Sequence, residues 1–222
     1  AARAVFVHQR LALIERQGSA RVATAVDAVL NYTERLARAR IAQLGNISGT
    51  ARDALEGDGV SDAEVPVVVT LSVTKGALRM DFTGSSPIVA GNVNCPASVT
   101  RAAAVFVLRT LLTYDVPTND GIARALDLVI PENSALNAKW PAAVAAGNVE
   151  MSQRITDTIF AALANAGIAV PAQGQGTMNN VTFGGGGGRS WTFYETLGGG
   201  QGASERSAGP SAVHVGMSNT LN

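Results

Sequence analysis

The sequence predicts an α+β fold, in which a helical N-terminal hairpin is followed by a mixed β-sheet region with buried helices. Three patterns carry this prediction. Apolar residues recur with a helical period over residues 19–44. The run "VPVVVTLSV" is rich in β-branched residues, and the run "ALRMDF" that follows it alternates. Residues 96–112 are apolar nearly all round, as is typical of a buried helix.

Residues 1–45 are expected to form the helical part. Residues 1–17 have a helical pattern, and Ser19 is expected to cap a second helix that ends near Leu44 and stops at Gly45. The short Gly-Ser break between the two helices predicts a helical hairpin. One apolar stripe of the second helix is formed by Val22, Val26, Val29, Leu30, Leu36 and Leu44. Residues 45–64 are polar, and "EGDGVSD" within them is expected to form a turn or loop.

Residues 65–222 are expected to form the mixed α/β core. "TKG" predicts a hairpin turn between the first two strands, and "LDLVI" a short strand that ends at Pro131. A helix is expected from Met151 to about Ala166, with Ile155, Ile159 and Leu163 on one face. Gly-rich loops and three strand-like runs follow, namely "TMNNVTFGG", "SWTFYETL" and "SAVHVGMS". We interpret residues 1–222 as a single fragment of a larger subunit, because the chain begins without Met inside a helical pattern.

Composition narrows the class of protein. Charged residues make up only 15% of the chain against 46% hydrophobic residues, which favours a subunit whose surface is partly covered by other chains. The 17 basic and 17 acidic residues balance without a basic block, so nucleic acid is not an expected partner. The chain has no apolar run of about 18 residues that could span a membrane. The single cysteine, Cys95, favours a reducing cytoplasm and a small buried side chain over a reactive thiol.

Several familiar catalytic motifs are missing. The glycines of "GGGGGR" lie between two strand-like runs and favour a flexible hairpin loop. "GGGQGA" at residues 198–203 is not followed by a helix, which a dinucleotide fingerprint requires. No phosphate-binding loop of the G-x-x-x-x-G-K-[ST] type occurs, so ATP would be bound by another polypeptide. His8 and His214 are the two histidines, and they cannot make a metal site alone.

Polar groups gather instead in short clusters within an apolar chain. The clearest is "GNVEMSQRITD" at residues 147–157, and others are "GNVNCP", "QGTMNN" and "YETLGGGQGA". Asn and Gln carry both donors and acceptors, and Gly lets the backbone approach a ligand. These clusters therefore indicate either tight turns or a polar pocket for an amide-like ligand. Pairing of Arg154 with Glu150 or Asp157 along the helix is the structural alternative for part of "GNVEMSQRITD".

Five motifs in order make the chain resemble the hydantoinase B/oxoprolinase family. They are "MDFTGSSPIVAGNVNCPASVTRAA", "GNVEMSQRITD", "QGTMNNVTFGG", "YETLGGGQGA" and "SAVHVGMSNT". The resemblance covers most of the chain from about Ser19 and corresponds to the later part of the family's large subunit. Gly216 departs from the family pattern, which commonly has a His or polar residue there.

The resemblance implies a B-type subunit of an ATP-dependent hydantoinase, a 5-oxoprolinase, or an acetone or acetophenone carboxylase. It implies a partner, the hydantoinase A-type ATPase subunit, which binds ATP and phosphorylates the carbonyl or enol oxygen of the substrate. It also implies a divalent metal, held by His and Asp residues in the remaining N-terminal part of the B-type subunit. The metal ligands are therefore expected outside this chain.

The positions of these motifs and the chemistry of their side chains give the candidate site. Glu150, Glu195 and His214 are the expected catalytic residues, with one of the two glutamates acting as a general base toward water. The expected substrate-binding residues, whose amides or backbone N–H groups can hold a carbonyl, a ring nitrogen or an oxyanion, are Asn148, Gln153, Asn179, Asn180, Gly199 and Gly200. The leading hypothesis is ATP-dependent hydrolysis of a small cyclic amide. The alternatives are a ketone carboxylase subunit and a non-catalytic structural subunit.

Overall fold

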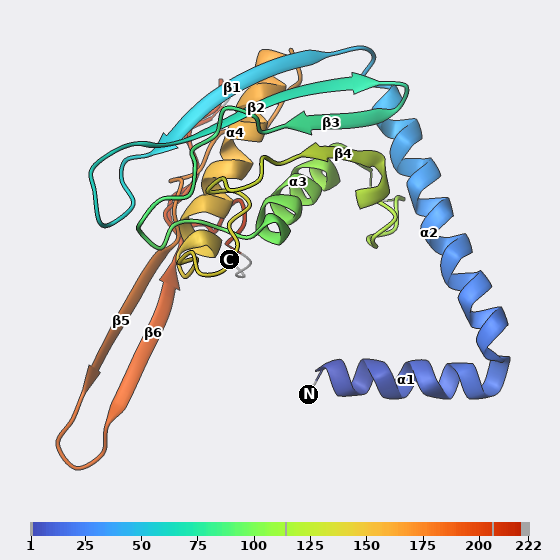
Figure 1. The fold of residues 1–222 in the computed structure, drawn as a ribbon, viewed down its shortest axis with the longest axis horizontal. Coiled ribbons are helices and arrows are strands. Elements are labelled where there is room, and N and C mark those ends of the chain that lie inside the picture. Colours follow the sequence, from blue (N-terminus) through green and yellow to red (C-terminus); the bar gives the residue numbers. More distant parts are fainter. Residues whose placement is uncertain (1, 114, 206, 219–222) are drawn as a thin grey trace.

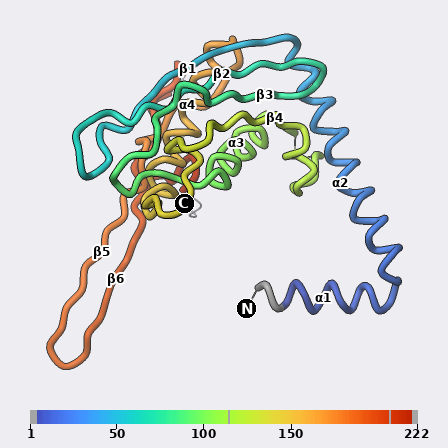
Figure 2. The backbone as a smooth tube through the Cα atoms, in the orientation of Figure 1, coloured from blue at the N-terminus to red at the C-terminus, as the bar shows by residue number. Residues whose placement is uncertain are grey.

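The computed structural model describes residues 2–113, 115–205 and 207–218, with side chains from residue 5 onward. Two helices, α1 (Ala2–Gln17) and α2 (Ser19–Ala42), form an arm that leads into the body. The body contains a four-stranded sheet and the helices α3 (Ala97–Leu111) and α4 (Ser152–Asn165). A two-stranded ribbon projects from it (Figures 1 and 2). The α+β prediction is confirmed, because a pair of helices is followed by a mixed sheet and by further helices and strands.

The sheet has the order β1-β2-β3-β4, with β1 (Ser48–Leu55), β2 (Val65–Thr74) and β3 (Ala77–Asp81) antiparallel. β4 (Leu126–Val129), which follows the short helix η1 (Ala123–Ala125), pairs parallel with β3. The predicted β2–β3 hairpin is confirmed. Thr74 pairs with Ala77, and the two turn residues Lys75 and Gly76 both have positive φ, which is the turn that matches strand twist.

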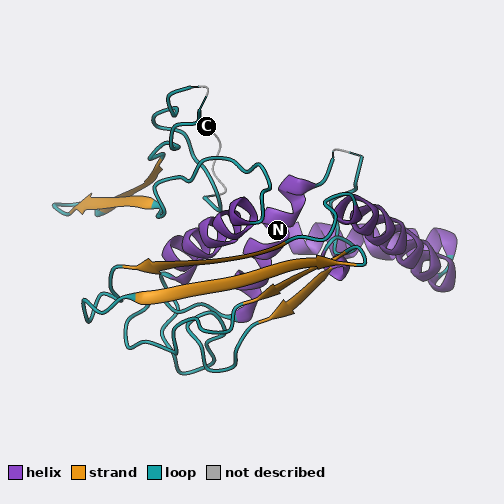
Figure 3. Cartoon of the chain, turned by 90° about the horizontal axis from the view of Figure 1, so that it is seen from above, coloured by secondary structure: helices purple, strands orange, loops and turns teal. Residues whose placement is uncertain are grey.

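The core lies between one face of the sheet and the helices α3 and α4 (Figure 3). Alternate residues of β2 face it, from Val65 to Val73, and the others are half-buried or exposed. The predicted face of α4 is confirmed, since Ile155, Ile159 and Leu163 are fully buried. Burial of each such side chain contributes about 1.5–3 kcal/mol. The predicted buried helix at residues 96–112 is α3, whose inner face is buried and whose outer face is half-exposed.

The helical arm differs from its prediction in detail. Ser19 does not cap α2: it is the first helical residue, the cap position is Gly18, and no side-chain capping bond forms. Two residues of the expected apolar stripe, Val26 and Val29, are 48% and 52% exposed. Val22 of the predicted stripe is buried, and the other buried positions of α2 are Thr33, Ala37 and Ile41. The reason is that only the C-terminal half of α2 contacts the sheet and η1, while the rest extends beyond the body (Figure 1).

The strands differ from the prediction at two places. Residues 48–55, for which no strand was predicted, form β1, an edge strand that pairs with β2 along its whole length. Few of its residues are apolar, because one edge of this strand is unpaired and only Ala51 and Leu55 are buried. The run "SAVHVGMS" was expected to be a strand, yet residues 211–218 form turns and irregular loop. The other two late runs are confirmed as β5 (Asn179–Gly185) and β6 (Trp191–Leu197), joined by the Gly-rich loop.

The loop between β1 and β2 is organised by the buried carboxylate of Asp58. It accepts hydrogen bonds from the backbone N–H groups of Val60 (2.8 Å), Ser61 (2.7 Å) and Gly91 (2.8 Å). These bonds favour the ionised form and lower the pKa of Asp58 to about 2, from the ordinary value of 3.8. Asp58 thus joins two loops that are distant in sequence.

Replacing Asp58 by Ala is expected to lower the melting temperature, because three backbone donors lose their acceptor. The folded pKa is lowered, so the stabilisation is present above pH 3.8 and is lost as the pH falls through about 2. Thermal unfolding of wild type and variant between pH 2 and 7 measures this. The exposed Asp62→Ala serves as the matched control. Equal melting temperatures for wild type and the Asp58 variant at pH 7 would contradict the assignment.

Candidate functional site

A polar pocket of about 440 Å³ lies where the end of β1, the start of α4 and the loop 175–177 meet. It carries carboxylates, a guanidinium, an amide and a hydroxyl within a wall that is otherwise backbone and two apolar side chains. The lining residues are Leu55, Glu56, Gly57, Val93, Glu150, Arg154, Gln175, Gly176 and Thr177. A pocket with a few polar groups converging on it is the usual form of a small-molecule site.

Glu150 enters this pocket from η2, a single π-helical turn (Gly147–Met151) that precedes α4. Gly147 begins the turn where a Cβ would overlap the backbone carbonyl of Asn94, so the close approach requires glycine. The Glu150 carboxylate accepts a hydrogen bond of 2.6 Å from the Thr177 hydroxyl. Single π-turns inside helices occur frequently at functional sites because they change the direction of side chains relative to the following α-helix.

Arg154 also lines the pocket, but its partner is not the one expected from the sequence. The sequence offered an ion pair of Arg154 with Glu150 or Asp157 along the helix. Arg154 instead forms its ion pair with Asp53 on β1, whose carboxylate lies 2.7 Å from Nη1. Both side chains are partly buried, with exposed fractions of 23% and 31%. Gly176 leaves space for the guanidinium, since a Cβ there would lie 3.1 Å from Nη2. The sequence lacked this signal because β1 was not predicted as a strand.

Asp157 is a buried carboxyl behind this ion pair. Its exposed fraction is 8%, and burial raises its pKa from 3.8 to about 6. The charge of Arg154 acts in the opposite direction, and the charge of Asp53 raises the pKa further. From the sequence, Asp157 was considered only as a possible helical partner of Arg154. Only the packing of α4 against β1 and β2 reveals it as a buried titratable group.

Two of the predicted substrate-binding residues, Asn179 and Gly199, contact Gln175 of the pocket wall, and Gly200 lies next to them in the chain. The Asn179 side chain donates a hydrogen bond of 2.8 Å to Oε1 of Gln175. Gly199 packs on the same amide, because a Cβ there would overlap Oε1 of Gln175. Gly200 has a φ of +97° and its N–H donates to the carbonyl of Val213. The N–H groups of residues 201 and 202 also donate to backbone carbonyls. These three N–H groups are therefore already hydrogen-bonded within the chain and are not available to an oxyanion.

Gln153 lies apart from this pocket and contacts the C-terminal loop. Its Oε1 accepts a hydrogen bond of 3.0 Å from the N–H of Met217, and a Cβ on Gly216 would overlap the same atom. Glycine at position 216 is therefore explained by packing against Gln153. Nε2 of Gln153 is buried with no hydrogen-bond partner among the described residues. His214 is half-buried in the same loop.

The remaining predicted residues are more exposed. Asn148 is exposed in η2, where its backbone carbonyl accepts a hydrogen bond from Ser152. Asn180 bridges the ribbon, since its Oδ1 accepts hydrogen bonds from Tyr194 (2.7 Å) and Thr196 (2.8 Å). Glu195 is exposed on β6, opposite Val181. The structure thus places Glu150 in the pocket wall, places Asn179 and Gly199 against the lining residue Gln175, and leaves Glu195 on the projecting ribbon. The roles assigned to these residues stay predictions.

The described part of the chain contains no group of three His, Cys, Asp or Glu residues that could hold a metal ion. Cys95 is fully buried, and burial raises the pKa of its thiol to about 11, which agrees with the structural interpretation of this residue. No helix among the described residues is long and apolar enough to cross a bilayer.

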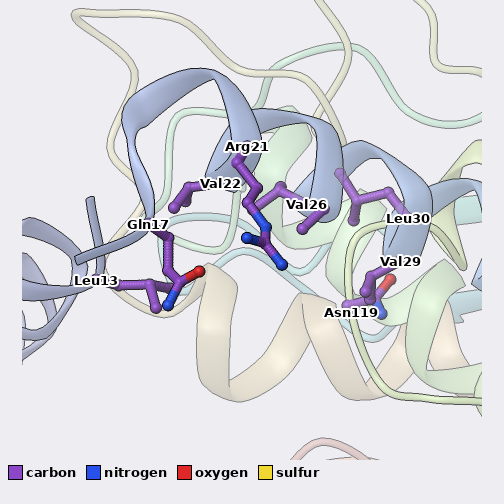
Figure 4. Close-up of a pocket in the computed structure, with 9 residues that line it drawn as sticks. Leu13, Gln17, Arg21, Val22, Val26, Val29, Leu30 and Asn119 are labelled. Carbon is purple, nitrogen blue, oxygen red and sulfur yellow. The ribbon is translucent and has the colours of Figure 1, made fainter. Parts of the chain in front are cut away.

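A second hollow of about 480 Å³ lies in the angle between α1 and α2 (Figure 4). Its walls are mainly aliphatic, formed by Leu13, Val22, Val26, Val29 and Leu30. The polar side chains Gln17, Arg21 and Asn119 stand among them in Figure 4. No carboxylate lines this hollow, so it lacks the general base that the polar pocket offers. Its apolar walls are typical of a contact surface rather than a reaction site.

Comparison with known proteins decides the family. A sequence model described as "Hydantoinase B/oxoprolinase" matches residues 1–222. The chain belongs to this family. The uncharacterized protein MJ0963 of Methanocaldococcus jannaschii is 39% identical over 88% of this chain and 34% of its own length. The 5-oxoprolinase 1 of Arabidopsis thaliana is 42% identical over 68% of this chain, but that region is only 11% of the plant protein.

The fold of the family is seen in solved structures as well. The ATP-dependent caprolactamase from Pseudomonas jessenii superimposes with a TM-score of 0.77 over 94% of this chain and 37% of its own, at 19% sequence identity. A nucleotide-free acetone carboxylase superimposes with a TM-score of 0.63 over 90% of this chain, at 17% identity. The chain spans about a third of the Methanocaldococcus protein and a smaller share of the oxoprolinases. The activities of those longer proteins therefore enter below as proposals.

Proposed function

We propose that this chain is part of the B-type subunit of an ATP-dependent cyclic amide hydrolase. The observation that carries the proposal is the polar pocket, in which the Glu150 carboxylate and the Arg154 guanidinium line one cavity of about 440 Å³. That volume suits a small ring, and the two groups supply a base and a cationic donor. Family membership and the similarity to a caprolactamase fold support the same reaction class.

The reaction that we propose divides the work between two polypeptides. An A-type ATPase subunit transfers the γ-phosphoryl group of ATP to the carbonyl oxygen of the ring amide. Water then adds to the carbonyl carbon, the ring C–N bond breaks with the amine as leaving group, and a second water hydrolyses the resulting acyl phosphate. One ATP, one cyclic amide and two waters give ADP, phosphate and one open-chain amino acid. Phosphorylation makes an unreactive amide carbon electrophilic.

In this scheme Glu150 is the general base. Its carboxylate takes a proton from the attacking water and passes that proton to the departing nitrogen. The hydrogen bond from Thr177 fixes one carboxylate oxygen and leaves the other for this proton transfer. Arg154 faces the same cavity and can stabilise negative charge on the carbonyl oxygen. The amide of Gln175, held by Asn179, completes the polar wall.

We further propose that the chain works in a cytoplasmic heteromer with the A-type ATPase subunit and the N-terminal part of the B-type subunit. Any divalent metal would take its ligands from outside this chain. The helical arm supports an assembly, because large apolar side chains on α1 and α2 are open to solvent. They are Val5, Phe6, Val7, Leu11, Leu13, Val26 and Val29, each at least 41% exposed.

A second candidate function is ATP-dependent carboxylation of a ketone. The observation that favours it is the likeness to acetone carboxylase, whose TM-score of 0.63 covers 90% of this chain. Consumption of acetone or acetophenone that depends on ATP and bicarbonate, without lactam hydrolysis, would support this function. A purely structural role is the third candidate. It predicts unchanged turnover after Glu150→Ala and Glu195→Ala in an intact assembly.

The test of the leading proposal is ATP dependence. The intact protein with its ATPase partner is expected to open hydantoin, 5-oxoproline or caprolactam only when ATP is present. Chromatography of the open-chain product, together with ADP release, measures the coupling. The same rate of ring opening without ATP would contradict the proposal.

A further inference from the structure

We propose that the pocket recognises the cis amide of a small ring, with Glu150 accepting a hydrogen bond from the amide N–H and Arg154 donating one to the carbonyl oxygen. Thr177 and Asp53 are the positioning residues, which keep Glu150 and Arg154 from pairing with each other. This inference rests on the proposed function and names the chemical group that the polar pocket recognises. The helical spacing of Glu150 and Arg154 favours an ion pair between them, but the structure does not contain this ion pair.

A Glu followed four residues later by an Arg on a helix ordinarily pairs with it. Here Glu150 and Arg154 line the same pocket, yet they make no ion pair with each other. Each is bound by a different element. Asp53 of β1 holds Nη1 of Arg154 at 2.7 Å, and the hydroxyl of Thr177 holds Oε1 of Glu150 at 2.6 Å. The π-turn η2 adds to this separation because it displaces Glu150 from the α-helical register of Arg154.

The Glu150 carboxylate and the Arg154 guanidinium can each still form a hydrogen bond with a ligand. The second carboxylate oxygen of Glu150 has no hydrogen-bond partner among the described residues. Nη1 of Arg154 is bound by Asp53, whereas Nη2, which lies beside Gly176 of the pocket wall, has no acceptor among the described residues. Nη2 is therefore the donor that Arg154 can offer to an acceptor in the pocket. The pocket therefore offers one anionic acceptor and one cationic donor side by side.

The cis amide of a small lactam matches this pair. Ring closure forces its N–H and its C=O onto the same edge, so both can be engaged from one side. The N–H would donate to Glu150, and the carbonyl oxygen would accept from Arg154. A ketone or a lactone of the same size has the carbonyl but lacks the donor. The pocket should therefore discriminate by the N–H group, whereas Asp53 and Thr177 act only through the two residues they hold.

The experiment compares two isosteric probes on the intact protein without ATP: 2-pyrrolidinone, and γ-butyrolactone, in which a ring oxygen replaces the N–H. Dissociation constants from ligand-observed NMR are expected to favour the lactam by roughly 10- to 100-fold, as for a hydrogen bond to a charged group. Glu150→Ala should abolish this preference. Glu56→Ala removes the other carboxylate of the same pocket and should keep it.

Two further variants test the positioning residues. Thr177→Val frees Glu150 to pair with Arg154, so both probes should bind more weakly. Asp53→Asn loosens Arg154 and should also weaken both probes, while the preference for the lactam persists. Equal binding of the two probes by wild type, or a preference unchanged by Glu150→Ala, would overturn the inference. Since no ATP is present, these results are independent of turnover: a protein that binds the lactam selectively but never opens it would refute the proposed function alone.

Discussion

Replacing Glu150 by Gln is expected to lower the kcat of ATP-dependent ring opening by about 100- to 10,000-fold, the usual contribution of a general base. Gln keeps the size of the side chain and an acceptor for Thr177, but it cannot take a proton from water. Folding should be unaffected, because Glu150 is half-buried and lies outside the main core. Steady-state kinetics of the intact protein with its ATPase partner measure the loss.

Glu195→Gln is the informative comparison, since Glu195 is the other glutamate that the sequence favoured. It is exposed on β6 and does not line the polar pocket, so its variant is expected to keep most of the activity. Glu132→Gln, at an exposed surface ion pair, controls for the loss of any carboxylate. The reverse pattern, with Glu195→Gln inactive and Glu150→Gln active, would move the reaction from the pocket to the ribbon.

Replacing Asp157 by Asn is expected to stabilise the protein at neutral pH by about 1–3 kcal/mol, from the cost of about 1.4 kcal/mol per pKa unit. Burial raises the pKa of Asp157 in the folded state from 3.8 to about 6. The folded state then binds the proton more tightly than the unfolded state. Wild-type stability should therefore fall as the pH rises from about 4 to about 6, and should stay reduced above that range.

Urea unfolding of wild type and Asp157→Asn at several pH values between 4 and 8 tests this. The variant should lose that part of the pH dependence and gain stability mainly above pH 6. Asp62→Asn, a change at an exposed aspartate, should leave the pH profile unaltered. Destabilisation of the Asp157 variant at pH 8 would mean that the attraction of Arg154 for the ionised carboxylate exceeds the desolvation cost.

Much of the body could be predicted because its elements have strong local patterns. β2, β3 and α4 carry regular alternation or helical spacing, since one face of each is buried against the others. β1 was missed because an edge strand with two buried apolar residues resembles a polar loop. "SAVHVGMS" was wrongly predicted as a strand, because its valines alternate although residues 211–218 find no strand to pair with.

The candidate site was predicted in part. The polar motif around Glu150 identified the correct helix start, and the glycines around Gly199 and the amide of Asn179 do meet the pocket wall through Gln175. Asp53 was missed because it lies 97 positions from Glu150 and in none of the polar clusters. Thr177 lies in the cluster "QGTMNN", but its hydrogen bond to Glu150, 27 positions away, could not be predicted from spacing. Their roles appear only where β1 and the loop 175–177 cross the start of α4.

The sequence by itself determined the family, the α+β class and the helix that bears Glu150, because these depend on residue order and local spacing. Only the tertiary structure decided which charges pair. Local spacing favours a Glu150–Arg154 ion pair, but Asp53 and Thr177 each bind one member through contacts that cross the fold. Burial, likewise a property of the packed state, makes Asp157 a titrating group near neutral pH. The charges of one helix are thus set by the strand and the loop that pack against it.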